Sequence, residues 1–204
     1  MNFCGGKTTD VMTSMQSSKL LSSLFENIDE EQRVTVLHIG PALPETVEFF
    51  SSFRCKLYFV DLFLELPIVA CEDKEPGLEQ TFIDLLDFPP GIKFDICLFW
   101  DLFNFLNSDA ISAFLAALRP HLHSASLAHG FSVHNRKSPR GDRIYGISQL
   151  DTLSVRDRKT ALPGYAPHAQ GQLKHMLNCF NFDRSVLLPD SRLELLFSAR
   201  LQGA

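Results

Sequence analysis

The sequence lacks the features of several large protein classes. Its five cysteines are scattered and contain no Cys-x-x-Cys pair, which disfavours a disulfide framework or a zinc site and favours a reducing, cytoplasmic location. Its apolar runs are only strand-length, so no membrane insertion is predicted, and the first ten residues lack the apolar centre of a secretion signal. The net charge of −5 argues against general nucleic-acid binding. No histidine cluster has metal-ligand spacing, so we predict no metal site.

What is present fits one globular domain. A chain of 204 residues with 45% hydrophobic residues is long enough to bury a real core. Leu21, Leu24, Phe25 and Ile28 follow helical spacing, so we expect residues 1–31 to form an N-terminal helical segment. The remaining residues, 32–204, are then the main domain.

The centre of the chain has the pattern of a strand, a turn, a helix and a second strand. Residues Val34–Ile39 form a β-branched, apolar run that ends at Gly40. The phenylalanines of 45–53 fall at helical spacing, and the apolar run 57–60 closes on Asp61. A unit of this kind, with a glycine after its first strand and an acid after its second, begins the nucleotide-binding half of many doubly wound sheets.

Strands and helices alternate in the rest of the chain. The stretch 136–170 interrupts them and is interpreted as a basic, irregular insertion, in which Arg136, Lys137, Arg140 and Arg143 are a solvated loop or a site for a phosphate or an acidic partner. We expect an α/β sheet that is parallel except near one edge. The predicted strands cover 78–83, 94–100, 125–133, 182–188 and 192–201, and the predicted helices cover 108–118 and 173–180.

Five stretches in this order resemble a class I S-adenosylmethionine-dependent methyltransferase. They are VLHIGPALPETVEFF, CKLYFVDL, FDICLFWDLFNFL, FLAALRPHL and FDRSVLLPDSRLELLFSARL. The resemblance implies a single doubly wound, mostly parallel, seven-stranded sheet of the class I methyltransferase type, with its last strand antiparallel. It also implies S-adenosylmethionine as the cofactor.

The first turn departs from the pattern of that family, which is acid-x-Gly-x-Gly-x-Gly. Here His38 replaces the acid, Gly40 is the glycine that is kept, and Ala42 and Pro44 replace the other two. Glycines let the backbone approach the cofactor, whose methionine carboxylate would face the amides at the start of the helix. Because the glycines are lost and Glu45 would repel that carboxylate, the turn predicts impaired cofactor binding.

The resemblance carries over a set of candidate site residues. Asp61 would accept hydrogen bonds from the ribose hydroxyls, and Asp84 and Leu85 would contact the adenine. Structural alternatives remain open: Gly40 as a plain turn, and Asp61 and Asp101 as helix caps. The candidate cofactor-binding residues are His38, Gly40, Asp61, Asp84 and Leu85, and the candidate acid–base groups are Asp101 and His134.

Three functions are compatible with these observations. The first, which the lost glycines favour, is a methyltransferase-like pseudoenzyme that lacks turnover, binds S-adenosylmethionine weakly or not at all, and acts as a binding or scaffolding partner in a protein complex. The second, which Asp61 and the FWDLFN segment favour, is an active methyltransferase that acts on a small molecule or a protein. The third is a different nucleotide-binding domain of the same topology. A dinucleotide-dependent dehydrogenase is disfavoured because its glycine fingerprint is absent.

Overall fold

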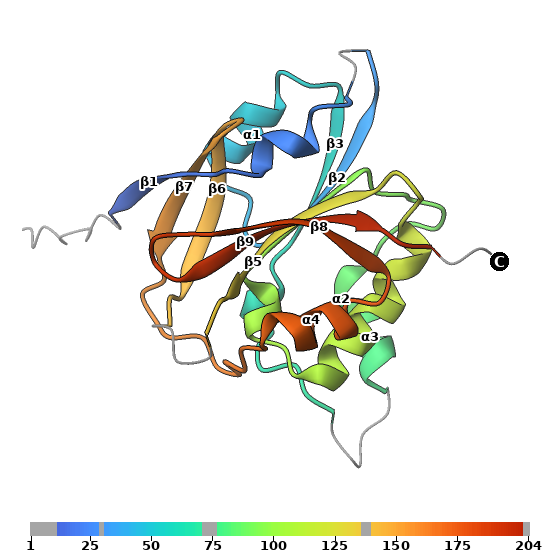
Figure 1. Ribbon diagram of the computed structural model, residues 1–204. Helices are drawn as coiled ribbons and strands as arrows, with labels where there is room; N and C mark the ends of the chain where they lie inside the picture. Colours follow the sequence, from blue (N-terminus) through green and yellow to red (C-terminus); the bar gives the residue numbers. More distant parts are fainter. Residues whose placement is uncertain (1–11, 29–30, 71–76, 136–139, 202–204) are drawn as a thin grey trace, which may run out of the picture.

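The computed structural model describes residues 12–28, 31–70, 77–135 and 140–201 (Figure 1). Its strands are β1 (Thr13–Ser17), β2 (Val34–Ile39), β3 (Cys55–Val60), β4 (Ile96–Trp100), β5 (Leu127–Val133), β6 (Arg143–Gln149), β7 (Thr152–Asp157), β8 (Phe180–Leu187) and β9 (Arg192–Ala199). Its α-helices are α1 (Pro44–Phe50), α2 (Leu78–Leu86), α3 (Ser108–Leu118) and α4 (Gln170–Met176), and its 3-10 turns are η1 (Leu21–Leu24), η2 (Leu62–Leu64), η3 (Leu102–Asn104) and η4 (Arg119–His121).

The main sheet has the strand order β3-β2-β4-β5-β9-β8. Strands β3, β2, β4 and β5 are parallel, whereas β9 is antiparallel to both of its neighbours, β5 and β8. The expectation of an α/β sheet whose last strand is antiparallel is therefore confirmed. The expected count of seven strands is not: the main sheet has six, and a separate antiparallel sheet is formed by β1, β7 and β6.

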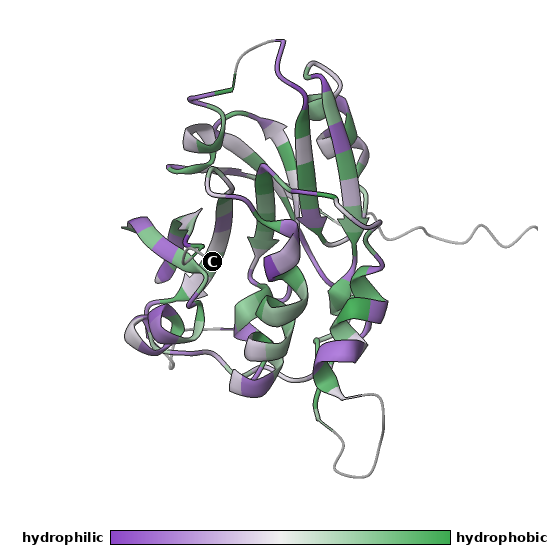
Figure 2. Ribbon diagram, turned by 90° about the vertical axis from the view of Figure 1, so that its right-hand side faces the viewer, coloured by the Kyte–Doolittle hydropathy of each residue, from purple (hydrophilic) through white to green (hydrophobic). Residues whose placement is uncertain are grey.

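The main sheet lies between two different layers. One face packs against the α2, α3 and α4 helices, and the other packs against α1, η1 and the three-stranded sheet (Figure 1). Neighbouring residues of β2 show the alternation of a strand, because Val36 faces the second layer and Leu37 faces the helices. With both faces covered, the central strands are predominantly hydrophobic, as Figure 2 shows.

The expected strand over 78–83 is instead the α2 helix, which extends to Leu86. Phe82 and Leu86 are four residues apart and are both buried, so they share the inner face of a helix. The Phe82 ring packs edge-on against Phe114 of α3, with 5.6 Å between ring centroids. The run Thr81-Phe82-Ile83 has strand-forming residues, but packing on α3 decides the conformation.

The expected N-terminal helix is also absent from the described part of the segment, residues 12–28. Thr13–Ser17 form β1, which pairs antiparallel with β7, and the 3-10 turn η1 follows. The Ser18 hydroxyl accepts a hydrogen bond from the Leu21 amide (2.9 Å) and begins this turn. Leu21 and Leu24 keep the apolar face that the sequence indicated, now on a 3-10 turn. Residues 1–11 lie outside the described residues.

The stretch 136–170 is ordered by a hairpin rather than being irregular throughout. Strands β6 and β7 pair within it, and Tyr145, Ile147, Leu153 and Val155 enter the core of the second layer. These residues alternate with polar ones, which is the period of a strand. Basic residues flank the two strands, and for this reason the sequence pattern indicates an irregular insertion over the whole stretch. Residues 136–139, which include Arg136 and Lys137, lie outside the described residues.

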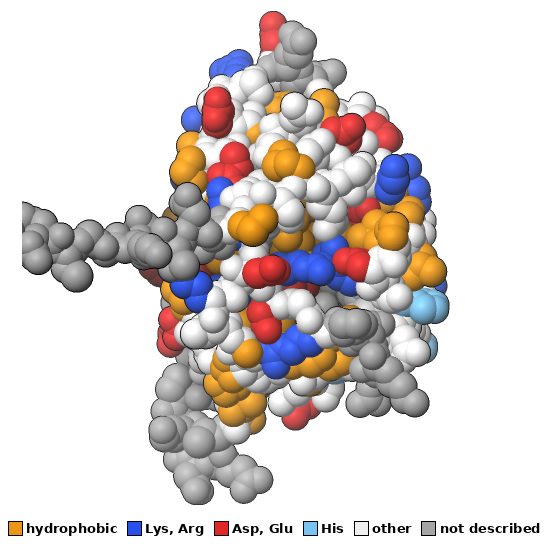
Figure 3. Space-filling model, turned by 90° about the vertical axis from the view of Figure 1, so that its left-hand side faces the viewer, with side chains coloured by type: hydrophobic (Ala, Val, Ile, Leu, Met, Phe, Trp, Pro, Cys, Tyr) orange, Lys and Arg blue, Asp and Glu red, His pale blue; other side chains and the backbone are white. Residues whose placement is uncertain are grey.

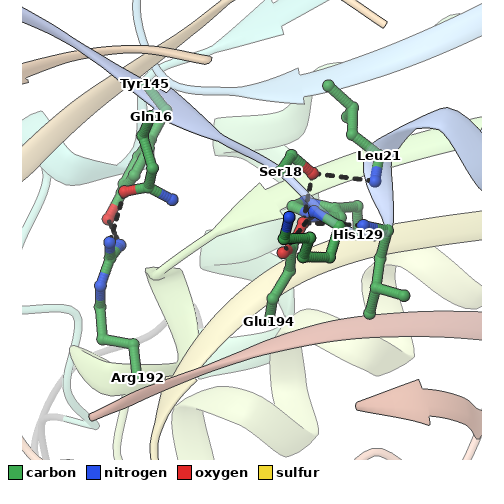
Figure 4. Close-up of polar contacts among 9 residues, drawn as sticks. Gln16, Ser18, Leu21, His129, Tyr145, Arg192 and Glu194 are labelled. Carbon is green, nitrogen blue, oxygen red and sulfur yellow. Dashed lines mark hydrogen bonds and ion pairs between the residues drawn. The ribbon is translucent and has the colours of Figure 1, made fainter. Parts of the chain in front are cut away.

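A buried carboxylate connects the two sheets (Figure 4). Glu194 of β9 accepts hydrogen bonds from the Ser18 hydroxyl and from the amides of Lys19 (2.9 Å) and Leu20 (3.2 Å). His129 of β5 lies 2.9 Å away, and both side chains of this pair are completely buried. Burial by itself would raise the pKa of Glu194, but the hydrogen bond and charge of His129, with Ser18 and the Lys19 amide, lower it to about 2.

We expect Glu194→Gln to lower the free energy of unfolding by about 1–3 kcal/mol, because an amide cannot accept from all the donors around Glu194 and leaves a buried polar group without a partner. Since the pKa of Glu194 is below its ordinary value of 4.5, its contribution is complete above pH 4.5 and is lost as the pH falls toward about 2. Urea unfolding at several pH values measures both effects. The exposed Glu48 gives the control Glu48→Gln, which should change stability by less than about 0.5 kcal/mol. Equal losses in both variants would contradict the prediction.

Candidate functional site

The strand order creates a crevice between β2 and β4. From β2 the chain moves to β3 on one side, and it then returns to β4 on the other side. The connections after β2 and β4 therefore leave the sheet in opposite directions, and in open α/β sheets ligands bind at the carboxyl ends of such strands. His38 and Gly40 lie at this end of β2, and Trp100 and Asp101 lie at this end of β4.

Aromatic side chains of the protein fill the β2 side of this crevice. The Trp100 indole N–H donates to Nε2 of His38 (3.2 Å), and Tyr145 of β6 stacks on Trp100 with 5.3 Å between ring centroids. Burial lowers the pKa of His38 to about 4, so the ring is neutral at pH 7. Because an indole N–H can only donate, the imidazole proton is on Nδ1. His38 thus carries no negative charge where the family pattern has an acid.

The turn after β2 is covered by the hairpin. Gly40 has a φ of +133°, so the position favours glycine, and the α1 helix begins at Pro44 as the sequence predicts. The Ile147 amide of β6 donates to the Thr46 hydroxyl (3.0 Å). Next to it, a Cβ on Gly146 would be only 2.8 Å from Oε1 of Glu45. The backbone of β6 therefore lies directly against the first turn of α1.

Glu45 keeps its negative charge at the start of α1. Its carboxylate accepts hydrogen bonds from Ser154 and Arg156 of β7. Burial alone would raise the pKa of Glu45, but these two hydrogen bonds lower it. The carboxylate is therefore ionised and held by Ser154 and Arg156 of β7.

Asp61 follows β3 and lies beside a basic side chain from the hairpin. Its Oδ1 accepts a hydrogen bond from the Phe63 amide (3.2 Å), so the alternative interpretation as a cap is confirmed. Nη2 of Arg158 is 3.9 Å from the same oxygen. Burial raises the pKa of Asp61, while Arg158 and the Phe63 amide oppose this shift. Part of the hydrogen-bonding capacity that a ribose would use is therefore already taken.

Asp101 is buried at the end of β4 with an unpaired oxygen. Trp100 before it has a φ of +52°, a strained value for a bulky residue, and strain of this kind is often stored at functional sites. Asp101 is only 3% exposed, and within the described chain neither its Oδ1 nor Oδ1 of Asn104 has a hydrogen-bond partner. Burial raises the pKa of Asp101 to about 7, against the opposing effects of its own backbone amide, Arg192, Arg158 and Arg143. Its side chain makes no capping bond to η3.

Of the other predicted site residues, Asp84 and His134 are exposed and lie apart from the crevice, and Leu85 lies in a pocket with Asp61. Asp84 is exposed on α2 and accepts a hydrogen bond from Gln80 (2.7 Å). Leu85 lines a pocket of about 460 Å³ with Asp61, between β3, η2 and the end of α2. His134 is exposed after β5, where its amide donates to the Ser191 carbonyl (3.1 Å).

Sequence reasoning missed Tyr145 and Arg158, which the fold brings to the crevice from more than forty positions downstream of Asp101. Both lie in the stretch interpreted as irregular. The alternation of Tyr145 with Ile147, and of Leu153 with Val155, was a signal for two strands. It would have placed the RDRK segment at the end of a strand, although not beside Asp61.

The described residues show no sign of a basic binding surface, a metal site or a membrane-spanning helix. Figure 3 shows acidic and basic side chains next to one another on the face that carries the three-stranded sheet, rather than a continuous basic surface. In the part of the chain that the structure describes, no group of three or more His, Cys, Asp or Glu side chains is placed to hold a metal ion. Among the described helices, none has the length and apolar character needed to span a bilayer.

We expect the charge of Asp101 to lower stability. Its pKa of about 7 is above the ordinary value of 3.8, so the folded state binds a proton that the unfolded state releases, and stability falls as the pH rises from about 4 to 7. The full effect is up to roughly 4 kcal/mol. Asp101→Asn should remove this part of the pH dependence in urea unfolding, whereas Asp84→Asn, at an exposed carboxylate, should keep it. Parallel stability curves for wild type and Asp101→Asn would contradict the prediction.

Comparisons with known proteins give distant structural matches only. No family profile and no curated protein matches the sequence. Similar solved structures include 1,6-didemethyltoxoflavin-N1-methyltransferase from Burkholderia thailandensis, with 13% identity, a TM-score of 0.47, and coverage of 82% of this chain and 72% of the other. An S-adenosylmethionine-dependent methyltransferase from Clostridium acetobutylicum has 14% identity, a TM-score of 0.48, and coverage of 81% and 83%. The N-methyltransferase NodS from Bradyrhizobium japonicum has 11% identity, a TM-score of 0.46, and coverage of 82% and 86%.

These identities are too low to transfer an activity, and these scores are too low to support an argument by themselves. The order and direction of the strands carry the assignment: a parallel block of β3, β2, β4 and β5, followed by the antiparallel β9 and the edge strand β8. The chain therefore has a class I methyltransferase-like fold.

Proposed function

We propose that this protein is a methyltransferase-like domain with impaired S-adenosylmethionine binding, which acts as a non-catalytic binding partner in a protein complex. The observation that carries the proposal is the position of the β6–β7 hairpin. Its backbone contacts the first turn of α1 at Thr46 and Glu45, at the place where the cofactor would approach the backbone. A cofactor that bound along this first turn would come against the β6 strand.

Electrostatics at the same place supports the proposal. The ionised Glu45 is paired with Arg156, so this nearby guanidinium is not free to attract a methionine carboxylate. The neutral His38 is already bonded to Trp100. Asp61 remains as a contact for the ribose, but Arg158 lies beside it.

A protein partner is supported by apolar side chains on the three-stranded sheet. Met12 is 90% exposed and Met15 is 60% exposed, both at the edge strand β1, whose outer backbone groups are not paired in that sheet. Exposed apolar groups beside an unpaired strand edge suit a protein contact. We place this function in the cytoplasm, in keeping with the free thiols of Cys55, Cys97 and Cys179.

The alternative is an active methyltransferase that acts on a small molecule or a protein. The unpaired buried oxygens of Asp101 and Asn104 favour it, because a bound ligand with hydrogen-bond donors would satisfy them. In that case Asp101 would position the acceptor or take a proton from it, and His134 would be a second candidate base. S-adenosylmethionine would supply the methyl group.

Calorimetric titration of the purified chain with S-adenosylmethionine and S-adenosylhomocysteine decides between the two. The proposal predicts no saturable binding of either compound up to about 1 mM. Micromolar binding that Asp61→Ala abolishes, and that Asp109→Ala at an exposed carboxylate of α3 leaves intact, would refute the proposal and favour the alternative. A loss in Asp84→Ala would in addition support the predicted contact with the adenine.

A further inference from the structure

A second pocket lies on the other side of the Asp61–Arg158 pair. It has a volume of about 460 Å³ and is formed by η2, the start of β6 and the loop between β7 and α4. Most of its wall is apolar. We name it the Arg158 pocket; its lining residues are Phe63, Leu64, Leu66, Ile144, Arg156, Asp157, Arg158, Lys159, Thr160, Ala161, Leu162 and Pro163.

Arg158 has two hydrogen-bond donors without partners. Its side chain is only 10% exposed, and neither Nε nor Nη2 donates a hydrogen bond to any described residue. The guanidinium lies over the Phe63 ring, 4.8 Å from its centroid, and the 3.9 Å to Asp61 is too long for a hydrogen bond. A buried charged group with unpaired donors is costly unless a partner completes it.

The geometry of these two donors indicates which partner fits. Nε–H and one Nη–H of a guanidinium point in the same direction and match two oxygens of one carboxylate or phosphate. The surroundings favour a single negative charge. Of the three cations in the wall, Arg156 is already paired with Glu45, while the carboxylates of Asp61 and Asp157 are close to Arg158 or next to it in the chain. A dianionic phosphate would meet more repulsion here than a carboxylate.

We propose that the Arg158 pocket binds a small monocarboxylate with an apolar body. The carboxylate takes both free donors of Arg158, and the apolar body contacts Phe63, Leu66 and Leu162. Because Nε and Nη2 are shielded from solvent without ligand, binding turns the guanidinium toward the pocket or shifts the loop 159–163. This inference does not rest on the proposed function, because it involves neither the turn after β2 nor S-adenosylmethionine.

The test is calorimetric titration of the full chain with 3-phenylpropionate. Three related probes separate the chemistry: 3-phenylpropanol lacks the charge, acetate lacks the apolar body, and phenyl phosphate replaces the carboxylate. We expect saturable binding of 3-phenylpropionate below about 1 mM, and binding at least roughly tenfold weaker for each of the other three.

Variants then test the role of Arg158. Arg158→Lys keeps the positive charge and the long stem but removes the paired donors, so it should weaken binding of 3-phenylpropionate roughly tenfold. Lys174→Gln, at an exposed cation of α4 outside the pocket, should weaken it less than about twofold. Thermal unfolding establishes that each variant is folded. Arg158→Gln serves as a second variant, with an expected loss at least as large.

Several outcomes would overturn the inference: no binding of 3-phenylpropionate at about 10 mM, equal binding of the alcohol, or tighter binding of phenyl phosphate. An equal loss in Lys174→Gln and Arg158→Lys would also overturn it, because the loss would then not depend on the paired donors of Arg158. Binding of S-adenosylmethionine would refute the proposed function and leave this inference in place.

Discussion

The buried carboxylate of Glu194 holds together two sheets that share no backbone pairing. It accepts hydrogen bonds from the segment after β1 while it forms an ion pair with His129 in the centre of the main sheet. An ionised carboxylate can stay in a fully buried place only when its surroundings supply this many donors. The three-stranded sheet is therefore fixed to the carboxyl half of the main sheet. This connection adds to the apolar packing of the hairpin and to its hydrogen bond with Thr46, which keep β6 against α1.

The fixed hairpin changes what the methyltransferase-like fold offers to a ligand. A crevice where the strand order reverses is normally an open site, but here Tyr145 and the backbone at Gly146 close the part beside β2. The part beside β3 and β4 keeps polar groups without partners, in Asp101, Asn104 and Arg158. The closed part supports the proposed impairment of cofactor binding, and the unpaired groups support the proposed ligand site next to it.

The two sides of the crevice also differ in the charges of their side chains. On the β2 side the ionised Glu45 faces the helix start, and His38 is neutral. On the other side Arg158 stacks on Phe63 next to an apolar pocket. Under the two proposals, an anionic ligand would bind beside Arg158 and not at the place that the family uses for the methionine carboxylate. A single fold can acquire a new binding site in this way without any change in its sheet.

The sequence by itself determined the elements whose signals are local. The β-branched run of β2, the Pro44 start of α1, the Asn107 cap of α3 and the β8–β9 hairpin were all predicted, because turn chemistry and apolar period act over a few residues. Only the tertiary structure decided the rest. Residues 78–83 became a helix by packing on α3, and Thr13–Ser17 became a strand by pairing with β7, nearly 140 positions away. Arg158 reached Asp61 in the same way, since contacts between distant segments leave no periodic trace in the sequence of either.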